Sequence, residues 1–190
     1  MQALKDKIIS EGQVIGTEII KVDGFLNHRI DVAFMEELGK EFKIRFHEAS
    51  INKVLTVEAS GIIVAAMTAK EFGNVPVVFA KKTTPNTMVD GFYGAEVKSF
   101  TKGIISTICV AKKYLVAEDR VLIIDDFLAH GEAALGLANL VEQAGAKVVG
   151  IGAVIEKEFQ GGSKKLRDKG YTVESLVVVT KIENGKINFK

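Results

Sequence analysis

The sequence predicts an α/β fold in which a central, mostly parallel sheet is flanked by helices. Short apolar runs alternate along the chain with segments that carry apolar residues at helical spacing. Residues 121–124 are four apolar residues in succession, as expected of a strand covered on both faces. With 190 residues and a hydrophobic content of 47%, the chain is long enough to form one domain around a sizeable core. We therefore expect a single domain over residues 1–190.

The first half of the chain alternates between helical and strand patterns. A helix begins after Asp31, a residue suited to capping, because apolar residues recur three and four positions apart behind it. Gly73 ends a later helix, and a β-branched run predicts the strand that precedes it. The predicted helices cover residues 4–9, 32–46 and 62–73; the strands cover 53–57 and 75–82; residues 17–31 are irregular or form a short strand.

The second half begins with a polar segment rich in turn residues, 83–94. Two antiparallel strands are expected around a turn near Gly103, and a helical stripe that starts at Ala134 ends at Gly145. The predicted strands cover residues 95–100, 105–115, 121–124, 147–157 and 173–182, and a short basic helix covers 163–170.

Composition excludes several classes of protein. Twenty-five Lys and Arg against 24 Asp and Glu leave a net charge of +1, which argues against a general binder of nucleic acids or membrane surfaces. No apolar stretch approaches the ~20 residues of a membrane span, and the charged N-terminus is unlike a secretory signal. One cysteine, Cys109, forms neither an internal disulfide nor a cysteine-rich metal site. We expect a cytoplasmic protein without a nucleic-acid or membrane partner.

The most informative segment runs from Asp125 to Ala133. Two adjacent carboxylates follow a buried strand, and a short loop then opens a helix. Ligands of open α/β sheets bind at the carboxyl ends of strands, and a helix N-terminus offers unpaired N–H groups to a phosphate. Gly131, between the small residues Ala129 and Ala133, allows the backbone to approach that phosphate closely. The alternative is an ordinary strand end with two solvated acids.

This segment resembles the phosphoribosyl-diphosphate motif of the type I phosphoribosyltransferases. The resemblance extends, in order, over nearly the whole chain and is strongest to members that act on xanthine; it is carried by FLNHRID (25–31), VEASGI (57–62), SFTKG (99–103), IIDDFLAHGEA (123–133) and VIEKEFQGG (154–162). It implies the type I fold, with a small hood from residues 1–30 and 156–190 and a flexible lid over 82–102. It also implies an enzyme that joins xanthine to phosphoribosyl diphosphate (PRPP), with Mg²⁺ bound through PRPP. Members of this kind are typically homodimers.

The resemblance assigns roles to three groups of residues. Asp125 and Asp126 flank the ribose. In this family the positions of His130 and Glu132 usually hold Asn and Gln, so Glu132 is expected to turn away from the phosphate or to pair with Lys or Arg. The 5′-phosphate is cradled by Ala129, His130, Gly131, Glu132 and Ala133, and the pyrophosphate by Glu58, Ala59, Ser60, Gly61, Lys81 and Lys82.

The pyrophosphate turn has ordinary alternatives. The resemblance implies a non-proline cis peptide bond in the turn, whereas Ser60 alone would suit a helix N-cap. Lys81 and Lys82 alone would be solvated surface charges.

The resemblance places the purine near Ile20, Asn27, Lys157 and Phe159. Asn27 offers both donors and acceptors to a ring N–H and a carbonyl. Lys157 would favour xanthine, which carries oxygens at C2 and C6 and an acidic ring N–H. Each residue also has a structural alternative: core packing for Ile20, turn capping for Asn27, a surface strand end for Lys157 and packing against the hood for Phe159.

Two other functions remain open. The first is the same reaction with guanine, hypoxanthine or adenine as the base. The second is a ligand-sensing regulator on the same fold, although such regulators carry an added DNA-binding module for which the early strand pattern leaves no room.

Overall fold

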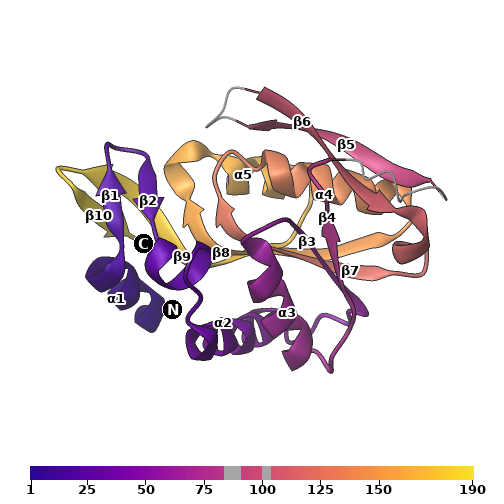
Figure 1. The fold of residues 1–190 in the computed structure, drawn as a ribbon, viewed down its shortest axis with the longest axis horizontal. Coiled ribbons are helices and arrows are strands. Elements are labelled where there is room, and N and C mark those ends of the chain that lie inside the picture. The colour runs from indigo at the N-terminus through magenta and orange to yellow at the C-terminus, as the bar shows by residue number, and fades with distance from the viewer. Residues whose placement is uncertain (84–90, 100–103) are drawn as a thin grey trace.

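The computed structural model describes residues 1–83, 91–99 and 104–190. Its centre is a six-stranded sheet in the order β10-β9-β8-β7-β3-β4 (Figure 1). Five of the strands run parallel, and only β10 pairs antiparallel with its neighbour. This confirms the predicted mostly parallel sheet. The strands are β3 (Lys53–Val57), β4 (Val77–Ala80), β7 (Arg120–Leu128), β8 (Lys147–Lys157), β9 (Val173–Glu183) and β10 (Lys186–Phe189).

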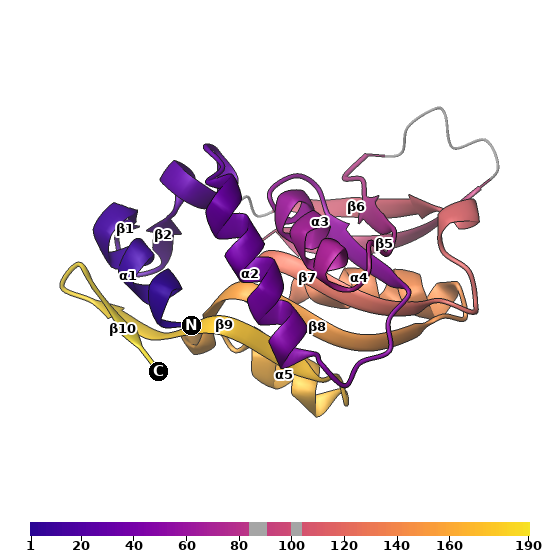
Figure 2. The ribbon, with the colours of Figure 1, turned by 90° about the horizontal axis from the view of Figure 1, so that it is seen from below.

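Two layers cover the sheet (Figures 1 and 2). On β7, Leu122 and Ile124 join the apolar core on one face, whereas Val121 and Ile123 join the core on the other. This alternation explains why residues 121–124 are all apolar. The first face carries α1 (Gln2–Glu11), α2 (Val32–Arg45) and α3 (Gly61–Glu71); the second carries α4 (Glu132–Gln143), α5 (Gly162–Asp168) and the antiparallel ribbon of β5 (Phe92–Ser99) and β6 (Ile104–Ala111).

Helix α2 begins as its sequence predicts. Asp31 is the N-cap, and its carboxylate accepts a 3.2 Å hydrogen bond from the N–H of Phe34. The apolar stripe behind it is buried, so the helix is held by its packing against the sheet and α3. The buried stripe consists of Met35, Leu38, Phe42 and Phe46.

The two ends of the chain lie side by side (Figures 1 and 2). The N-terminal ammonium donates to the carbonyl of Leu176 at 2.8 Å, and the Nζ of Lys5 donates to the carbonyl of Lys190 at 2.6 Å. β9 belongs to the central sheet, and α5 packs on it. The N-terminal segment continues through β1 (Gln13–Ile15), β2 (Ile19–Lys21) and a π-helical turn, η1 (Asp23–Asn27).

Several predicted boundaries were wrong. The strand predicted over 105–115 ends at Ala111, because residues Lys112–Tyr114 form a 3₁₀ helix. β7 continues past Asp125 and Asp126 to Leu128, because Phe127 still pairs with Ile155 of β8. The turn near Gly103 and residues 84–90 and 100–102 of the expected lid lie outside the described residues, and residues 92–99 of that lid form β5. Among the described residues, no helix is long and apolar enough to cross a membrane.

Candidate active site

The carboxyl ends of the parallel strands bring the predicted polar residues to one edge of the sheet. Asp125 and Asp126 lie near the end of β7, and Lys157 is the last residue of β8. Glu58 follows β3 directly, and Lys81 follows β4. These four strands are parallel neighbours, so their ends meet at the same edge, where ligands of open α/β sheets bind.

The two acids are held in place by their own backbone. The Oδ1 atom of Asp125 accepts from the N–H of Asp126 at 2.9 Å, and the Oδ1 atom of Asp126 accepts from the N–H of Phe127 at 3.0 Å. Burial, followed by the negative charge of Asp126, raises the pKa of Asp125 well above the ordinary value. The remaining oxygens suit ribose hydroxyls or the waters of a bound cation.

The turn Glu58–Gly61 packs against these acids. A Cβ atom at Gly61 would lie 3.1 Å from the Oδ1 of Asp125 and would collide with the hydroxyl of Thr56, so this approach requires glycine. The peptide bond between Glu58 and Ala59 is cis, as the resemblance implies. Ser60 occupies the N-cap position of α3, as the capping alternative expects, but its side chain makes no capping hydrogen bond to the helix.

The same turn is joined to the two lysines at the end of β4. The N–H of Glu58 donates to the carbonyl of Ala80 at 3.1 Å, and its carboxylate accepts from the N–H of Lys82 at 2.7 Å. The structure thus brings the Glu58–Gly61 turn against the backbone of Lys82, some twenty residues further along the chain. Lys81 lines a cavity together with Phe79 and Tyr114.

The loop after β7 leads into the N-terminus of α4. Gly131 precedes the helix with φ of 81°, a left-handed conformation that favours glycine. The first N–H groups of a helix have no partner within it, so those at the start of α4 are available to an anion. The N–H of Gly162 donates to the carbonyl of Ala129 at 3.0 Å, which places the start of α5 against this loop.

Glu132 turns to a basic partner, as expected. Its Oε1 atom lies 2.5 Å from the Nζ of Lys165 on α5. The ring Nδ1 of His130 lies 3.2 Å from the carbonyl of Gln160. Both side chains therefore bind the segment that contains α5, and the loop presents its backbone.

The residues predicted to contact the purine do not all lie in similar surroundings. Lys157 is half-buried; its Nζ donates to the carbonyl of Glu18 at 2.7 Å and lies 5.4 Å from the centre of the Phe127 ring. Burial lowers the pKa of Lys157. Ile20 is 5% exposed and belongs to the core, whereas Asn27 is exposed on η1. Phe159, 40% exposed, lies in a short 3₁₀ helix, η3 (Glu158–Gln160).

Comparison with known proteins identifies the family. Residues 35–186 match the phosphoribosyl transferase domain. The chain belongs to the phosphoribosyltransferase family. It is 54% identical over 189 residues to the xanthine phosphoribosyltransferase of Ruminiclostridium cellulolyticum, covering 100% of this chain and 99% of that protein. It is 53% identical over 190 residues to that of Clostridium novyi, covering 100% of each.

Solved structures show the same type I phosphoribosyltransferase fold. The adenine phosphoribosyltransferase of Giardia lamblia, complexed with 9-deazaadenine, matches with a TM-score of 0.70 and 27% identity, covering 78% of this chain and 81% of that one. The adenine phosphoribosyltransferase of Rhodothermus marinus matches with a TM-score of 0.74 and 23% identity, covering 94% and 100%. The predicted fold class is thereby confirmed.

Two features of this phosphoribosyltransferase site were missed from the sequence. Phe127 lies beside Lys157, but as an apolar residue in an expected loop it gave no signal. Gly162 lies against Ala129 and Gly131, and the signal was present in the GG pair of the motif at 154–162. Within residues 1–83, 91–99 and 104–190, no three His, Cys, Asp or Glu side chains form a cluster that could hold a metal ion.

Proposed function

We propose that this phosphoribosyltransferase is a cytoplasmic purine-salvage enzyme that converts xanthine and PRPP to xanthosine 5′-monophosphate and pyrophosphate. The observation that carries the choice of base is Lys157, a half-buried cation at the same sheet edge as Asp125 and Asp126. Xanthine offers two exocyclic oxygens and an acidic N–H to such a group. Full-length relatives named xanthine phosphoribosyltransferase support the same choice.

The reaction requires positioning and electrostatic stabilisation, without a covalent enzyme intermediate. The N9 atom of xanthine forms a bond to C1′ as the bond from C1′ to the pyrophosphate oxygen breaks. Pyrophosphate leaves with that electron pair, and the N9 proton passes to solvent water. In this proposal the backbone of Ala129–Ala133 holds the 5′-phosphate and the carboxylates of Asp125 and Asp126 hold the ribose hydroxyls.

The pyrophosphate is assigned to the Glu58–Gly61 turn together with Lys81 and Lys82. Two observations support this assignment. Gly61 approaches Asp125 closely, which brings the turn to the ribose side, and Glu58 is bonded to the backbone of Lys82. Two lysines following one strand provide positive charge for a diphosphate leaving group.

Magnesium fits the chemistry of this site. Mg²⁺ prefers oxygen ligands and keeps several waters, and Asp125 and Asp126 present adjacent carboxylates. When bound with PRPP, the ion would neutralise charge on the diphosphate. Asp125 and Asp126 would hold it through its waters.

The base would lie between Lys157 and the N-terminal segment. The bond from Lys157 to the carbonyl of Glu18 joins the end of β8 to the residues just before Ile20. Because the side chain of Ile20 is in the core, we assign its contact with xanthine to the backbone. Asn27 and Phe159, both exposed, are the remaining candidate contacts, together with the ring of Phe127.

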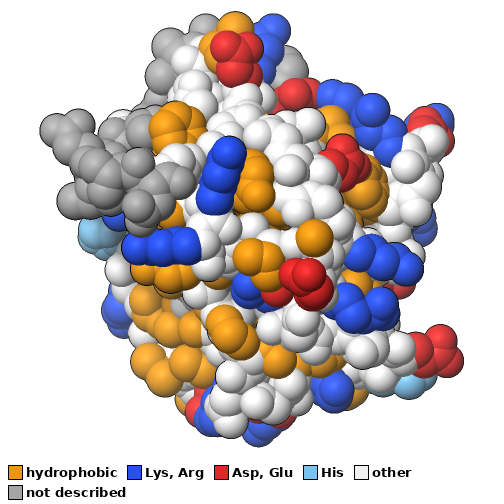
Figure 3. All heavy atoms as spheres, turned by 90° about the vertical axis from the view of Figure 1, so that its right-hand side faces the viewer, with side chains coloured by type: hydrophobic (Ala, Val, Ile, Leu, Met, Phe, Trp, Pro, Cys, Tyr) orange, Lys and Arg blue, Asp and Glu red, His pale blue; other side chains and the backbone are white. Residues whose placement is uncertain are grey.

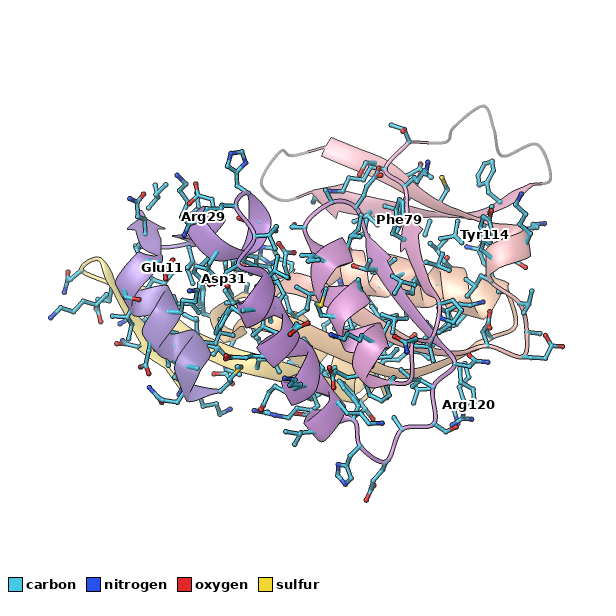
Figure 4. The ribbon with its side chains drawn as sticks, turned by 60° about the horizontal axis from the view of Figure 1, so that its bottom comes forward. Glu11, Arg29, Asp31, Phe79, Tyr114 and Arg120 are labelled. Carbon is cyan, nitrogen blue, oxygen red and sulfur yellow. The ribbon has the colours of Figure 1, made fainter. Side chains whose placement is uncertain are left out.

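A homodimer would use the outer strand β4. Phe79 on β4 is 39% exposed and Tyr114 is 55% exposed, and both line one cavity of about 630 Å³. Figure 4 shows them on the same side of the molecule, and hydrophobic side chains gather on the face shown in Figure 3. Phe79→Asp should halve the mass measured by light scattering; Ile44→Asp, an exposed position on α2, should not.

The test of the function is a steady-state assay with PRPP and Mg²⁺ against xanthine, guanine, hypoxanthine and adenine in turn. We expect xanthine to give the highest kcat/KM. A preference for adenine would reject the assignment of the base. No nucleotide from any base, with DNA binding that responds to purines, would instead support a ligand-sensing regulator.

A further inference from the structure

A buried carboxylate lies beneath the candidate site without taking part in it. Glu156 is the last residue but one of β8, and it is 1% exposed. One of its oxygens accepts from the hydroxyl of Ser163, and the other accepts from the hydroxyl of Ser175 at 2.6 Å. The two serines lie on different elements, α5 and β9, so Glu156 joins both to β8.

Burying a carboxylate costs free energy, which hydrogen bonds to its oxygens offset. Removing one donor therefore leaves part of the charge unsatisfied. It also removes the hydrogen bond that ties the donor's helix or strand to Glu156. The two serines can thus be distinguished by what else their elements contact.

The element that carries Ser163 contacts the candidate phosphate loop. Gly162, the residue before Ser163, donates its N–H to the carbonyl of Ala129 at 3.0 Å. A Cβ atom at Gly131 would lie 3.2 Å from the Cα of Gly162, so the two backbones touch. One turn further on, Lys165 pairs with Glu132. The element that carries Ser175 is β9, a strand of the central sheet, and Ser175 itself pairs with Ala153 of β8.

Glu156 is also aligned with the loop in the sheet register. It pairs with Leu128 on β7, the residue just before Ala129. Its side chain reaches across to Ser163, next to the glycine that binds Ala129. Glu156 therefore contacts both sides of the loop: its backbone pairs with the strand that leads into the loop, and its side chain binds the helix that packs on the loop.

We propose that Glu156 is a positioning residue: through Ser163 it holds the first turn of α5 against the backbone of Ala129–Gly131 and so sets the affinity of that loop for the 5′-phosphate. The inference rests on the proposed function of the loop. It predicts an effect on phosphate affinity that follows Ser163 and does not follow Ser175.

The test compares two matched substitutions, Ser163→Ala and Ser175→Ala. Each removes one hydroxyl from the same carboxylate, so both should lower the thermal midpoint to a similar extent. Binding of ribose 5-phosphate is measured by calorimetry, and KM for PRPP and for xanthine by steady-state kinetics. We expect Ser163→Ala to weaken ribose 5-phosphate binding and raise KM for PRPP about three- to tenfold, part of the energy of a hydrogen bond to a charged group. KM for xanthine should stay within about twofold, as should all three values for Ser175→Ala.

A conservative substitution provides the rescue. Glu156→Gln keeps the shape and can bind both hydroxyls, since an amide accepts and donates. It should retain wild-type phosphate affinity within about threefold. Equal losses of phosphate affinity for the two serine variants would overturn the positioning role. If the wild-type protein itself binds no ribose 5-phosphate, the proposed function of the loop fails, and the inference with it.

Discussion

The Nζ of Lys157 lies 5.4 Å from the centre of the Phe127 ring, so the end of β8 meets the residue that follows Asp126 on β7. A purine bonded to C1′ of a ribose that Asp126 holds would extend toward this pair. The side chain of Lys157 is half-buried, and this partial withdrawal of the ammonium from water lowers its pKa. A hydrogen bond from such a group to a substrate oxygen discriminates more strongly than one at a solvated lysine.

Lys157→Ala should reduce kcat/KM for xanthine more than for hypoxanthine. Xanthine carries an oxygen at C2 that hypoxanthine lacks, and a charge-assisted hydrogen bond is worth about 1.5–3 kcal/mol, or roughly 10- to 150-fold. Steady-state kinetics on both bases measures the ratio. Lys164→Ala, an exposed lysine on α5, should leave the ratio unchanged. Equal losses on both bases would show that Lys157 only ties β8 to Glu18.

Asp126→Asn should cut turnover with PRPP about 100-fold, because it removes a charge beside the reacting sugar. The fold should remain intact, since an amide oxygen can still accept the N–H of Phe127. Turnover and far-ultraviolet circular dichroism are measured on the same preparation. Wild-type kinetics from this variant would remove Asp126 from the ribose site.

Asp125→Asn should stabilise the protein at pH 7 while lowering its activity. The pKa of Asp125 is raised in the folded state, so its charged form costs stability at any pH above that raised value. The cost declines as pH falls through the folded pKa and is absent below the unfolded pKa, near 3.9. Each kcal/mol relieved should raise the thermal midpoint by about 2–4 °C.

Thermal melts without PRPP or Mg²⁺, from pH 8 down to about pH 4, measure this effect of Asp125→Asn because they reach the unfolded pKa. The gain should shrink toward acid pH. Asp6→Asn, at an exposed position on α1, controls for the substitution of an aspartate by asparagine. A lower midpoint for Asp125→Asn at pH 7 would contradict the account of the two acids.

Lys165→Met should weaken PRPP binding by releasing the carboxylate of Glu132 beside the phosphate. The pair is partly exposed, with the two side chains 44% and 28% accessible, so the expected rise in KM is only about two- to fivefold. Lys164→Met breaks an exposed pair with Asp168 and is the matched control. The double variant Lys165→Met with Glu132→Gln should recover wild-type KM. If the double variant keeps the raised KM, the carboxylate of Glu132 is not what weakens PRPP binding.

The sequence predicted the boundaries of the buried strands best. The strands at 53–57 and 147–157 agree with β3 and β8 at both ends, because buried parallel strands need continuous apolar residues. β1, β2 and β10 were missed or left open, since three- and four-residue strands at the surface carry no such run. β7 was predicted too short because its acids interrupt the apolar pattern while its hydrogen bonding continues.

The site could be predicted where a motif is local and not where it depends on packing. Asp125, Asp126 and the loop to Ala133 are contiguous, so a single segment contained the signal. The contact of Gly162 with Ala129 joins residues more than thirty positions apart. Glu156 gave no signal either, because its two serine partners come from separate elements that only the folded chain brings together.

The central claim is that backbone N–H groups after the paired aspartates bind the 5′-phosphate. A crystal structure of the protein with xanthosine 5′-monophosphate tests it directly. We predict the phosphate on the N–H groups of residues 129–133, the ribose against Asp125 and Asp126, and the base beside Lys157. A phosphate bound elsewhere, with the loop at the start of α4 empty, would contradict the account.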